Sequence, residues 1–195
     1  MKKSMDRFLN YLNTIFNLSD AAKDYLSIHG KIKVFPAGSY YKFDDEKIEK
    51  WCFMLEGLAA RIGFENDNEV IERIYCKDFY FSGTKHVFSK TSERISIKFL
   101  RKSEIYEIQN HHLRIAFQQY QELQECYLVL KEYEIQYIKD LLSILKSPSK
   151  KRLYELHRRQ PFLLSILTVK EKISYLNFKN IKEYYSSLGF LIYST

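Results

Sequence analysis

Long apolar runs are missing from this sequence. No stretch approaches the ~18 uninterrupted apolar residues that a membrane-spanning helix requires. The first residues, Met1-Lys2-Lys3-Ser4-Met5-Asp6, lead into a mixed pattern and not into the apolar core of a signal peptide. We therefore expect a soluble cytoplasmic protein that has no membrane partner.

Cysteine is also scarce, with three residues in 195. Cys52, Cys76 and Cys126 are far apart in the sequence and odd in number. This spacing predicts neither a disulfide framework nor a pair of cysteines that binds a metal. We expect reduced thiols buried in the core, and a metal or redox role is the alternative.

The patterns that mark common enzyme sites are absent as well. With six glycines the chain contains no glycine-rich phosphate loop, and it shows no Ser/His/Asp order and no metal-ligand spacing. The sequence therefore predicts a protein that is not an enzyme and that carries no cofactor and no metal. His86, His111 and His112 could serve haem or a metal, but we interpret them as isolated surface histidines.

Positive charge is abundant and unevenly distributed. The net charge is +7, and the stretch from Lys146 to Lys182 holds ten basic residues against two acidic ones, so it carries +8 and the rest sums to −1. A localised basic segment on a near-neutral protein is typical of proteins that bind the phosphate backbone of nucleic acids. The alternative is a solvated helical face that keeps the protein soluble.

The first half of the chain changes from a helical period to a period of two. Apolar spacing predicts two short helices between Met5 and His29, and alternation from Gly30 onward predicts strands. Glu56-Gly57 suits a tight hairpin in which glycine takes a positive φ. Further strands are expected within 51–55, 58–64, 70–75, 95–99 and 105–108. Many short strands joined by polar turns indicate a barrel or a jelly-roll-like sandwich.

A long helix is expected next, because no proline occurs between His112 and Pro148 and apolar residues recur every three or four positions. Such a helix, of about 25 residues or more, needs a partner for its apolar seam. Pairing with a second copy in a homodimer is one solution, and packing along the β-domain is the other, since Glu134 interrupts the seam. The predicted dimer seam consists of Leu123, Tyr127, Leu130, Tyr137 and Leu141.

The last fifty residues predict several short helices. Ser149 can cap a helix that ends at Gln160-Pro161, and Thr168 with Glu171 forms a capping box for the next one. Asn177 can adopt the left-handed conformation of a tight turn before a final helix over 181–188. Two short helices joined by a tight turn in basic surroundings are typical of a helix-turn-helix, although generic helical hairpins are common.

Taken in order, these segments make the chain resemble the Crp/Fnr family from about residue 10 to residue 188. The passages that carry the likeness are Phe35-Pro36-Ala37-Gly38-Ser39, Phe53-Met54-Leu55-Glu56-Gly57-Leu58, Asp78-Phe79, Ser103-Glu104-Ile105-Tyr106-Glu107-Ile108, Ser149-Lys150-Lys151-Arg152-Leu153-Tyr154-Glu155-Leu156, Gln160-Pro161 and Ile173-Ser174-Tyr175-Leu176.

The resemblance implies an α+β fold in three parts. A β-roll of the cyclic-nucleotide-binding type, jelly-roll-like, is expected over 1–112 as a sensor domain, a long dimerisation helix over 113–146, and a helix-turn-helix domain, winged-helix-like, over 147–195. It also implies a homodimer that binds DNA, with a small-molecule effector as a further partner whose identity the sequence does not give.

The expected ligand pocket departs from the family. Cyclic-nucleotide-binding members carry glycine and glutamate shortly after the aspartate-phenylalanine pair, where this chain has Phe81 and Ser82. Glu93 stands at the position of the arginine that neutralises the phosphate, with Arg94 one residue later. We therefore expect no tight binding of cAMP or cGMP, and Phe79, Tyr80, Phe81 and Phe88 suggest a pocket filled by the protein's own rings. The candidate pocket residues are Phe81, Ser82, Gly83, Thr84, Glu93 and Arg94.

The expected reader helix departs too, because the serine-arginine pair of close relatives is replaced by a segment without arginine. The leading hypothesis is a transcription regulator that does not respond to cAMP. Its alternative is a ligand-sensing or protein-interaction module that has lost sequence-specific DNA binding, which the paired Tyr184 and Tyr185 support. The candidate DNA-binding residues are Lys150, Lys151, Arg152, Lys170, Lys179, Asn180, Lys182 and Ser186.

Overall fold

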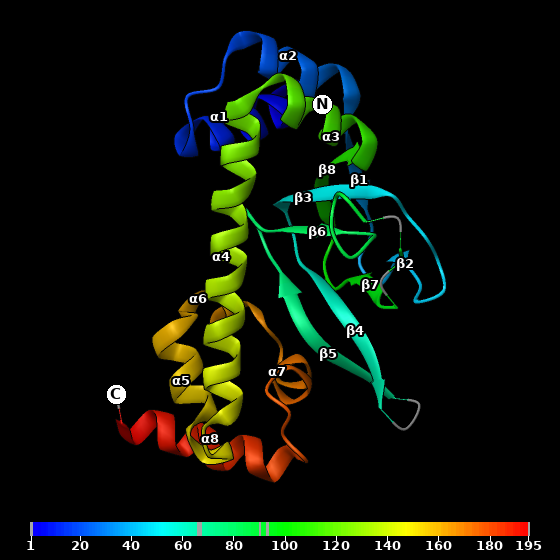
Figure 1. Ribbon diagram of the computed structural model, residues 1–195. Helices are drawn as coiled ribbons and strands as arrows, with labels where there is room; N and C mark the ends of the chain where they lie inside the picture. The colour runs from blue at the N-terminus through cyan, green and yellow to red at the C-terminus, as the bar shows by residue number, and fades with distance from the viewer. Residues whose placement is uncertain (1, 66–67, 90, 93, 195) are drawn as a thin grey trace. The chain divides into compact units, whose positions relative to one another are not determined.

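The computed structural model describes residues 2–65, 68–89, 91–92 and 94–194 and divides the chain into two compact units, Met1–Lys131 and Glu132–Thr195 (Figure 1). The elements of the first unit are α1 (Lys2–Ile15), α2 (Asp20–His29), β1 (Gly30–Phe35), β2 (Tyr40–Lys42), β3 (Lys50–Glu56), β4 (Ala59–Glu65), β5 (Asn68–Tyr75), β6 (Tyr80–Ser82), β7 (Ser96–Phe99), β8 (Ser103–Gln109) and α3 (Asn110–Gln119). Helix α4 (Gln121–Lys146) begins in the first unit and ends in the second.

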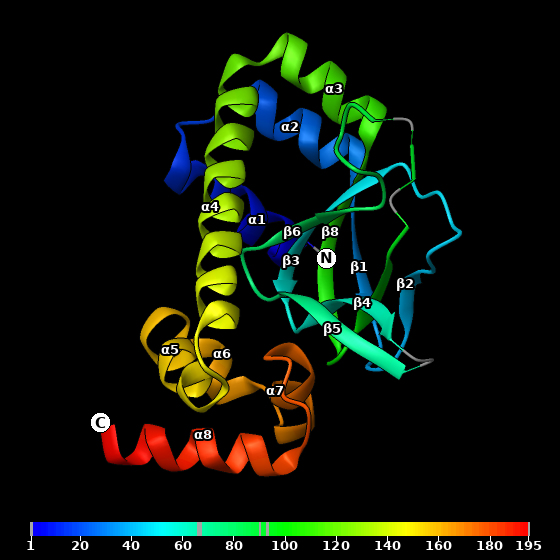
Figure 2. The ribbon, with the colours of Figure 1, turned by 60° about the horizontal axis from the view of Figure 1, so that its bottom comes forward.

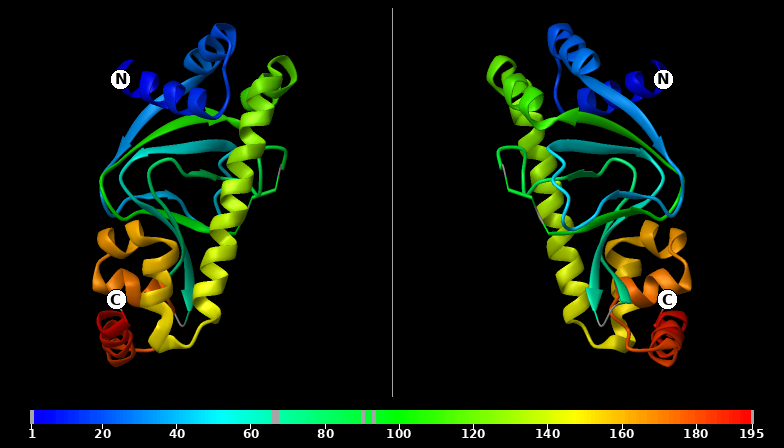
Figure 3. Two further views of the ribbon diagram at one scale, coloured as in Figure 1. Left: turned by 90° about the vertical axis from the view of Figure 1, so that its left-hand side faces the viewer. Right: turned by 90° about the vertical axis from the view of Figure 1, so that its right-hand side faces the viewer.

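The strands form two antiparallel sheets, with the orders β1-β8-β3-β6 and β2-β7-β4-β5. Figure 2 shows α1, α2 and α3 gathered on the outer side of the first sheet. The curvature of both sheets around a shared interior is visible in Figure 3. This arrangement confirms the expectation of an α+β fold with an antiparallel β-roll, although the short strands β2 and β6 were not predicted.

Local sequence explains several junctions of the roll. Ser19 caps α2 by accepting a hydrogen bond from the amide of Ala22, and Gly57 adopts a φ of 90° in the β3–β4 hairpin, as predicted. Gly30 begins β1 where a Cβ would lie 2.1 Å from the ring of Tyr106. That close approach lets the Tyr106 hydroxyl donate to the carbonyl of Leu26 at 2.9 Å, which ties β8 to α2.

Two hydrophobic clusters stabilise the first unit. The helix-side core joins α1, α2, α3 and the first half of α4 to the outer face of the first sheet, through residues such as Phe8, Leu26, Trp51, Tyr106 and Leu123. The roll interior lies between the two sheets and contains Tyr41, Cys52, Met54, Tyr75, Phe81, Ile97, Phe99 and Ile105. Successive residues of a strand face opposite sides, so β3 supplies Trp51 to one cluster and Cys52 to the other.

The second unit consists of the end of α4, a 3₁₀ turn η1 (Ser149–Lys151), α5 (Arg152–Arg159), α6 (Pro161–Ile166), α7 (Val169–Tyr175) and α8 (Ile181–Ser194). Thr168 and Glu171 form the predicted capping box of α7, and Asn177 has a φ of 51° in the turn that follows. The buried hydroxyl of Ser187 on α8 accepts a hydrogen bond from the amide of Leu153 at 3.1 Å, which fixes α8 against α5.

Three expectations for the helices need correction. The helix expected over 113–146 is interrupted at Tyr120, and its uninterrupted part is the 26-residue α4. Ser149 does not cap a helix, because Pro148 precedes a 3₁₀ turn and α5 begins only at Arg152. The expected wing is not found, since every element within residues 132–194 is helical. Pro161 begins α6 at the first helical position, where the fixed φ of proline suits a helix.

Candidate nucleic-acid interface and filled ligand pocket

The roll interior, where the sequence placed a ligand pocket, is filled by aromatic rings. Phe81 is buried at its centre, with ring centroids 5.1 Å from Tyr41, 5.4 Å from Tyr75 and 6.5 Å from Phe99. Phe35 stacks on Phe99 from the other side at 4.5 Å. Phe81 therefore fills the roll interior, as expected from the sequence, with Phe79 packed against the same cluster. Tyr80 lies instead in the helix-side core and Phe88 is 58% exposed, so these two rings do not fill the interior.

The remaining predicted pocket residues are engaged locally or turned outward. The hydroxyls of Ser82 and Thr84 lie 3.2 Å apart, and buried Thr84 accepts a hydrogen bond from Asn110 at 2.9 Å. A Cβ on Gly83 would meet the carbonyl oxygen of Ile48 at 2.1 Å, so this loop is packed tightly against the segment before β3. Arg94 is exposed, and Glu93 lies outside the described residues.

A polar cluster at the edge of the roll interior was missed by the sequence analysis. Glu107 on β8 is 5% exposed and accepts hydrogen bonds from Lys33 at 2.9 Å, Lys50 at 2.8 Å and the Tyr41 hydroxyl at 2.8 Å. Burial alone would raise the pKa of Glu107, but the hydrogen bonds from these three donors together lower it. The signal in the sequence was a glutamate inside the apolar strand segment Ile105-Tyr106-Glu107-Ile108.

The cysteines behave as the sequence predicted, since all three are free and buried. Burial raises the pKa of Cys76 to about 11 and that of Cys126 to about 11, and it raises the pKa of Cys52 as well. A thiol that stays protonated at neutral pH is a poor nucleophile and a poor metal ligand. No group of three or more His, Cys, Asp or Glu side chains within the described residues could hold a metal ion.

The histidines are not all isolated, which corrects the interpretation from the sequence. His111 and His112 lie in the first turn of α3, and their ring centroids are 3.9 Å apart. His29, at the end of α2, stacks on His112 at 4.2 Å. Burial, followed by the charges of His111 and His29, lowers the pKa of His112. These contacts join α2 to α3.

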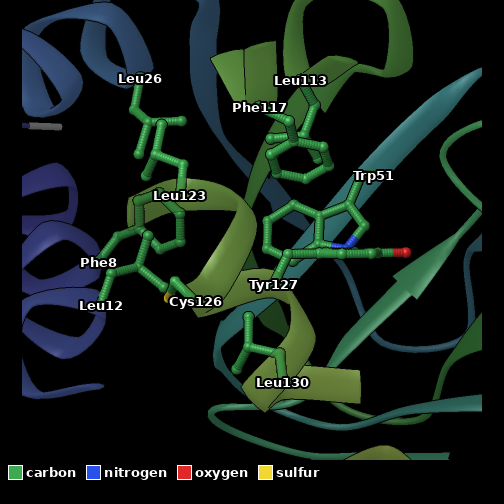
Figure 4. Close-up of a pocket in the computed structure, with 10 residues that line it drawn as sticks. All are labelled: Phe8, Leu12, Leu26, Trp51, Leu113, Phe117, Leu123, Cys126, Tyr127 and Leu130. Carbon is green, nitrogen blue, oxygen red and sulfur yellow. The ribbon is translucent and has the colours of Figure 1, made fainter. Parts of the chain in front are cut away.

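A small apolar cavity lies within the helix-side core (Figure 4). Its volume is about 20 Å³, roughly the space of one water molecule, so it does not accommodate an organic ligand. The Nε1 of Trp51 has no hydrogen-bond partner among the described residues. The close-up shows the benzene side of the indole, and not this nitrogen, facing Phe8 and Leu123. The lining residues are Phe8, Leu12, Leu26, Trp51, Leu113, Phe117, Leu123, Cys126, Tyr127 and Leu130.

Most of the predicted DNA-binding side chains lie on the surface of the second unit. Lys170 is exposed at the beginning of α7, and Lys179 and Lys182 are exposed around the beginning of α8. Lys150, Lys151 and Ser186 are exposed as well. The structure therefore leaves all five lysines that were predicted to bind DNA accessible to a polyanion.

Two of the predicted DNA-binding residues also have structural roles. The guanidinium of half-buried Arg152 donates to the carbonyls of Leu176 at 2.8 Å and Asn177 at 2.7 Å, so it stabilises the turn between α7 and α8. The side-chain oxygen of Asn180 accepts hydrogen bonds from the amides of Lys182 and Glu183, which caps α8. Both side chains hold the two helices in place, and their contact with DNA stays a prediction.

The two tyrosines of α8 differ in burial, so only one of them packs in the core. Tyr184 is buried, and its ring meets Phe178 edge-on at 6.1 Å. Tyr185 is 59% exposed. One ring therefore belongs to the core and the other to the surface of the helix.

The predicted dimer seam is buried inside the chain's own fold. Leu123, Tyr127 and Leu130 pack in the helix-side core of the first unit, which is the alternative that the sequence left open for this helix. Leu141 is buried in the second unit, and the hydroxyl of buried Tyr137 lies 2.7 Å from that of Tyr175 on α7. These residues are already covered, so a dimer contact requires another face of α4.

Such a face exists on α4. Leu128, Ile135 and Leu142 are spaced by seven residues, and Ile138 lies between the last two. These four side chains are exposed by 38% to 53%. A repeat of seven with an intermediate apolar position is the pattern of helices that pair along their length.

We expect Arg152→Met to lower the melting temperature of the second unit, because it removes the donors that satisfy two carbonyls of the α7–α8 turn. Hydrogen bonds to a charged group contribute about 1.5–3 kcal/mol, so a loss of that order is expected. Thermal denaturation followed by circular dichroism measures it. The control Arg158→Met changes an exposed side chain and should alter the stability by less than about 0.5 kcal/mol. Equal losses in the two variants would contradict the structural role of Arg152.

Several solved structures have a fold similar to that of this chain. The chain is similar to FixK2 from Bradyrhizobium japonicum, with 12% identity, a TM-score of 0.65 and coverage of 85% of each chain. It is also similar to the sensor domain of the transcriptional regulator DNR from Pseudomonas aeruginosa, with 14% identity, a TM-score of 0.52 and coverage of 63% of this chain and 89% of that one. The regulatory domain of Toxoplasma gondii PKA, solved with cAMP, matches at 8% identity and a TM-score of 0.52, over 60% of this chain and 45% of that one.

The chain has a cyclic-nucleotide-binding-like fold. At these identities the likeness concerns the fold alone. No protein-family model and no curated protein matches the sequence. None of the helices in the described residues is long and apolar enough to cross a membrane.

Proposed function

We propose that this protein is a DNA-binding transcription regulator, not an enzyme, that acts as a homodimer and does not respond to cAMP or cGMP. The observation that carries the proposal is the arrangement of α7 and α8. Two capped helices joined by a left-handed turn bear exposed Lys170, Lys179 and Lys182, on a chain with a cyclic-nucleotide-binding-like fold. The filled roll interior accounts for the lack of a nucleotide response.

In this proposal α7 and α8 form a helix-turn-helix, and α8 lies in the major groove. Lys150, Lys151, Lys170, Lys179 and Lys182 contact phosphates, while Arg152 and Asn180 hold the two helices in place. Because phosphate contacts release counterions, the affinity falls steeply with salt. The competing function is an interaction module that has lost DNA binding, and the exposed apolar residues of α8 are the feature that favours it.

The test is a mobility-shift assay on fragments from the protein's own genomic neighbourhood, followed by anisotropy titrations at several salt concentrations. We expect retardation at low salt and an affinity that drops by a factor of about 10³–10⁵ between roughly 50 and 200 mM salt. Replacing Lys170, Lys179 and Lys182 together by alanine should lower the slope of log affinity against log salt by about 0.9 for each contact removed.

A matched control replaces Lys3, Lys31 and Lys85, which are exposed lysines of the first unit, by alanine. This triple variant has the same net charge as the tail variant but keeps the proposed interface. If the wild-type protein shows no retardation at low salt, or if both triple variants lose the same affinity, the proposed function is wrong.

Dimerisation is proposed to use the exposed stripe of Leu128, Ile135, Ile138 and Leu142. We expect Ile138→Glu to shift the protein toward monomer, because a dimer would have to bury an unpaired carboxylate beside its own copy. Analytical ultracentrifugation should show a dissociation constant raised by about 100-fold or more. Ser143→Glu adds the same charge at an exposed position outside the stripe and serves as the control. A wild-type protein that is monomeric at high concentration would contradict this part of the proposal.

A further inference from the structure

The exposed face of α8 is more apolar than a reader helix needs for contacting phosphates. Ile181, Lys182, Tyr185 and Ser186 occupy positions one, two, five and six of the helix, which places them on one side. Ile181 is 43% exposed and Tyr185 is 59% exposed. Tyr184 and Ser187 are buried on the opposite side. Ile181 and Tyr185, four residues apart, therefore form one apolar row on the first two turns, and Lys182 and Ser186 form the row beside it.

Apart from Lys182, the side chains that usually read bases by paired hydrogen bonds are not available on this face. No arginine follows Arg159 in the sequence, so the guanidinium contact to guanine cannot form there, and Lys182 is the one side chain of this face that can make the paired donation to guanine. Asn180 has its side-chain oxygen committed to the amides of Lys182 and Glu183. A paired contact to adenine needs both the oxygen and the nitrogen of the amide. Glu183 accepts a hydrogen bond from the amide of Lys179 at 3.0 Å, which directs its carboxylate to the helix start.

We propose that α8 recognises the C5-methyl groups of thymine through Ile181 and Tyr185. This inference rests on the proposed function and specifies the DNA that the site prefers. Of the four bases, only thymine presents a methyl group in the major groove, and apolar side chains contact it. Lys182, in the row beside the two apolar residues, supplies a phosphate contact that holds the helix in the groove.

Charge favours DNA over an apolar protein partner as the occupant of this face. Lys170, Lys179 and Lys182 are all exposed at the beginnings of α7 and α8. An apolar protein partner that covered this face would have to remove water from the ammonium groups of these lysines, which costs free energy.

The experiment compares the full chain on short duplexes of equal length with alternating sequences, by fluorescence anisotropy at low salt. The probes are dA-dT, dA-dU, dG-dC and dG paired with 5-methyl-dC. Deoxyuridine removes only the methyl group of thymine, and 5-methyl-dC adds a methyl group at the corresponding position of the groove. We expect dA-dT to bind more tightly than dA-dU by about fourfold for each buried methyl group, and methylation of dC to raise the affinity similarly.

Variants assign the effect to residues. The double variant Ile181→Ser with Tyr185→Ser should lose the preference for methylated duplexes while its salt-dependent binding remains. Tyr193→Ser, at a 92% exposed position near the end of α8, is the matched control and should keep the preference. Lys182→Ala should weaken binding to all four duplexes by the same factor. Circular dichroism melts confirm that the variants are folded.

The possible failures are distinguishable. Equal binding to dA-dT and dA-dU, with the expected salt dependence, would overturn the methyl inference and leave the proposed function intact. No binding to any duplex at low salt would overturn both. If the double variant keeps its DNA affinity and preference but changes its self-association, the face is a protein contact and the inference is wrong.

Discussion

Replacing Phe81 by alanine is expected to lower the free energy of unfolding by about 3–5 kcal/mol, the range for truncating a buried phenylalanine. The ring lies in the middle of the roll interior, in contact with Tyr41, Tyr75 and Phe99, so the surrounding rings cannot close the space that it leaves. Urea denaturation measures the loss. Trp51 is the only tryptophan and packs in the helix-side core, so its fluorescence reports the unfolding of this unit.

Phe88→Ala is the matched control, because Phe88 is a phenylalanine of the same segment that is exposed. It should cost well under 1 kcal/mol. If Phe81→Ala lowered the free energy of unfolding as little as Phe88→Ala, the conclusion that Phe81 packs in the roll interior would be contradicted. Calorimetry adds a functional readout: neither the wild type nor Phe81→Ala should bind cAMP or cGMP, since Ser82 supplies no carboxylate for the ribose. Micromolar affinity of the wild type would overturn the interpretation of the pocket.

The local features of this fold could be predicted where a few neighbouring residues determine the backbone. Thr168 and Glu171 satisfy each other's amides, Gly57 is free to take a positive φ, and Asn177 tolerates the left-handed conformation. Each of these signals lies within four residues of the sequence. The antiparallel character of the roll could also be predicted, because alternation and polar turns reflect a sheet with two different faces.

The partner of each apolar stripe could not be predicted in the same way. Helix α4 carries one apolar stripe with Leu123 and Leu130 and another with Leu128 and Ile135. Both satisfy the helical period, so periodicity alone does not tell which one the chain covers by itself. The structure assigns the first stripe to the helix-side core and leaves the second exposed. The stripe that the sequence favoured for a dimer contact is therefore the one that the chain covers by itself.

The same limit applies to charged residues. Counting charges identified the basic stretch from Lys146 to Lys182. It could not distinguish Arg152, which donates to carbonyls of its own chain, from Lys170, which is exposed. The distinction depends on Leu176 and Asn177, which lie 24 and 25 positions after Arg152 in the sequence and contact it only in the folded protein. Glu107 was overlooked for a similar reason, since its partners Lys33, Lys50 and Tyr41 come from three other segments.

Glu107→Gln is expected to lower the free energy of unfolding by about 2–3 kcal/mol at neutral pH. Removing one partner of a buried ion pair costs about 3–5 kcal/mol, and we place the loss below that range because Lys33 and Lys50 are partly exposed and can turn toward water. The amide keeps the shape of the side chain, so the loss reports the missing charge. Glu72→Gln removes the charge of an exposed pair with Arg61 and should cost less than about 1 kcal/mol.

The stability that Glu107 contributes is expected to depend on pH. Because the pKa of Glu107 is lowered in the folded protein, the unfolded chain binds its proton first as the pH falls. The stability that the carboxylate contributes is complete above the ordinary glutamate pKa of about 4.3 and is lost as the pH falls through the lower folded value. The difference between wild type and Glu107→Gln should therefore be constant from neutral pH to about pH 5 and shrink below it. A difference that persists unchanged at low pH would show that the variant perturbs packing, and that the charge of Glu107 does not stabilise the roll.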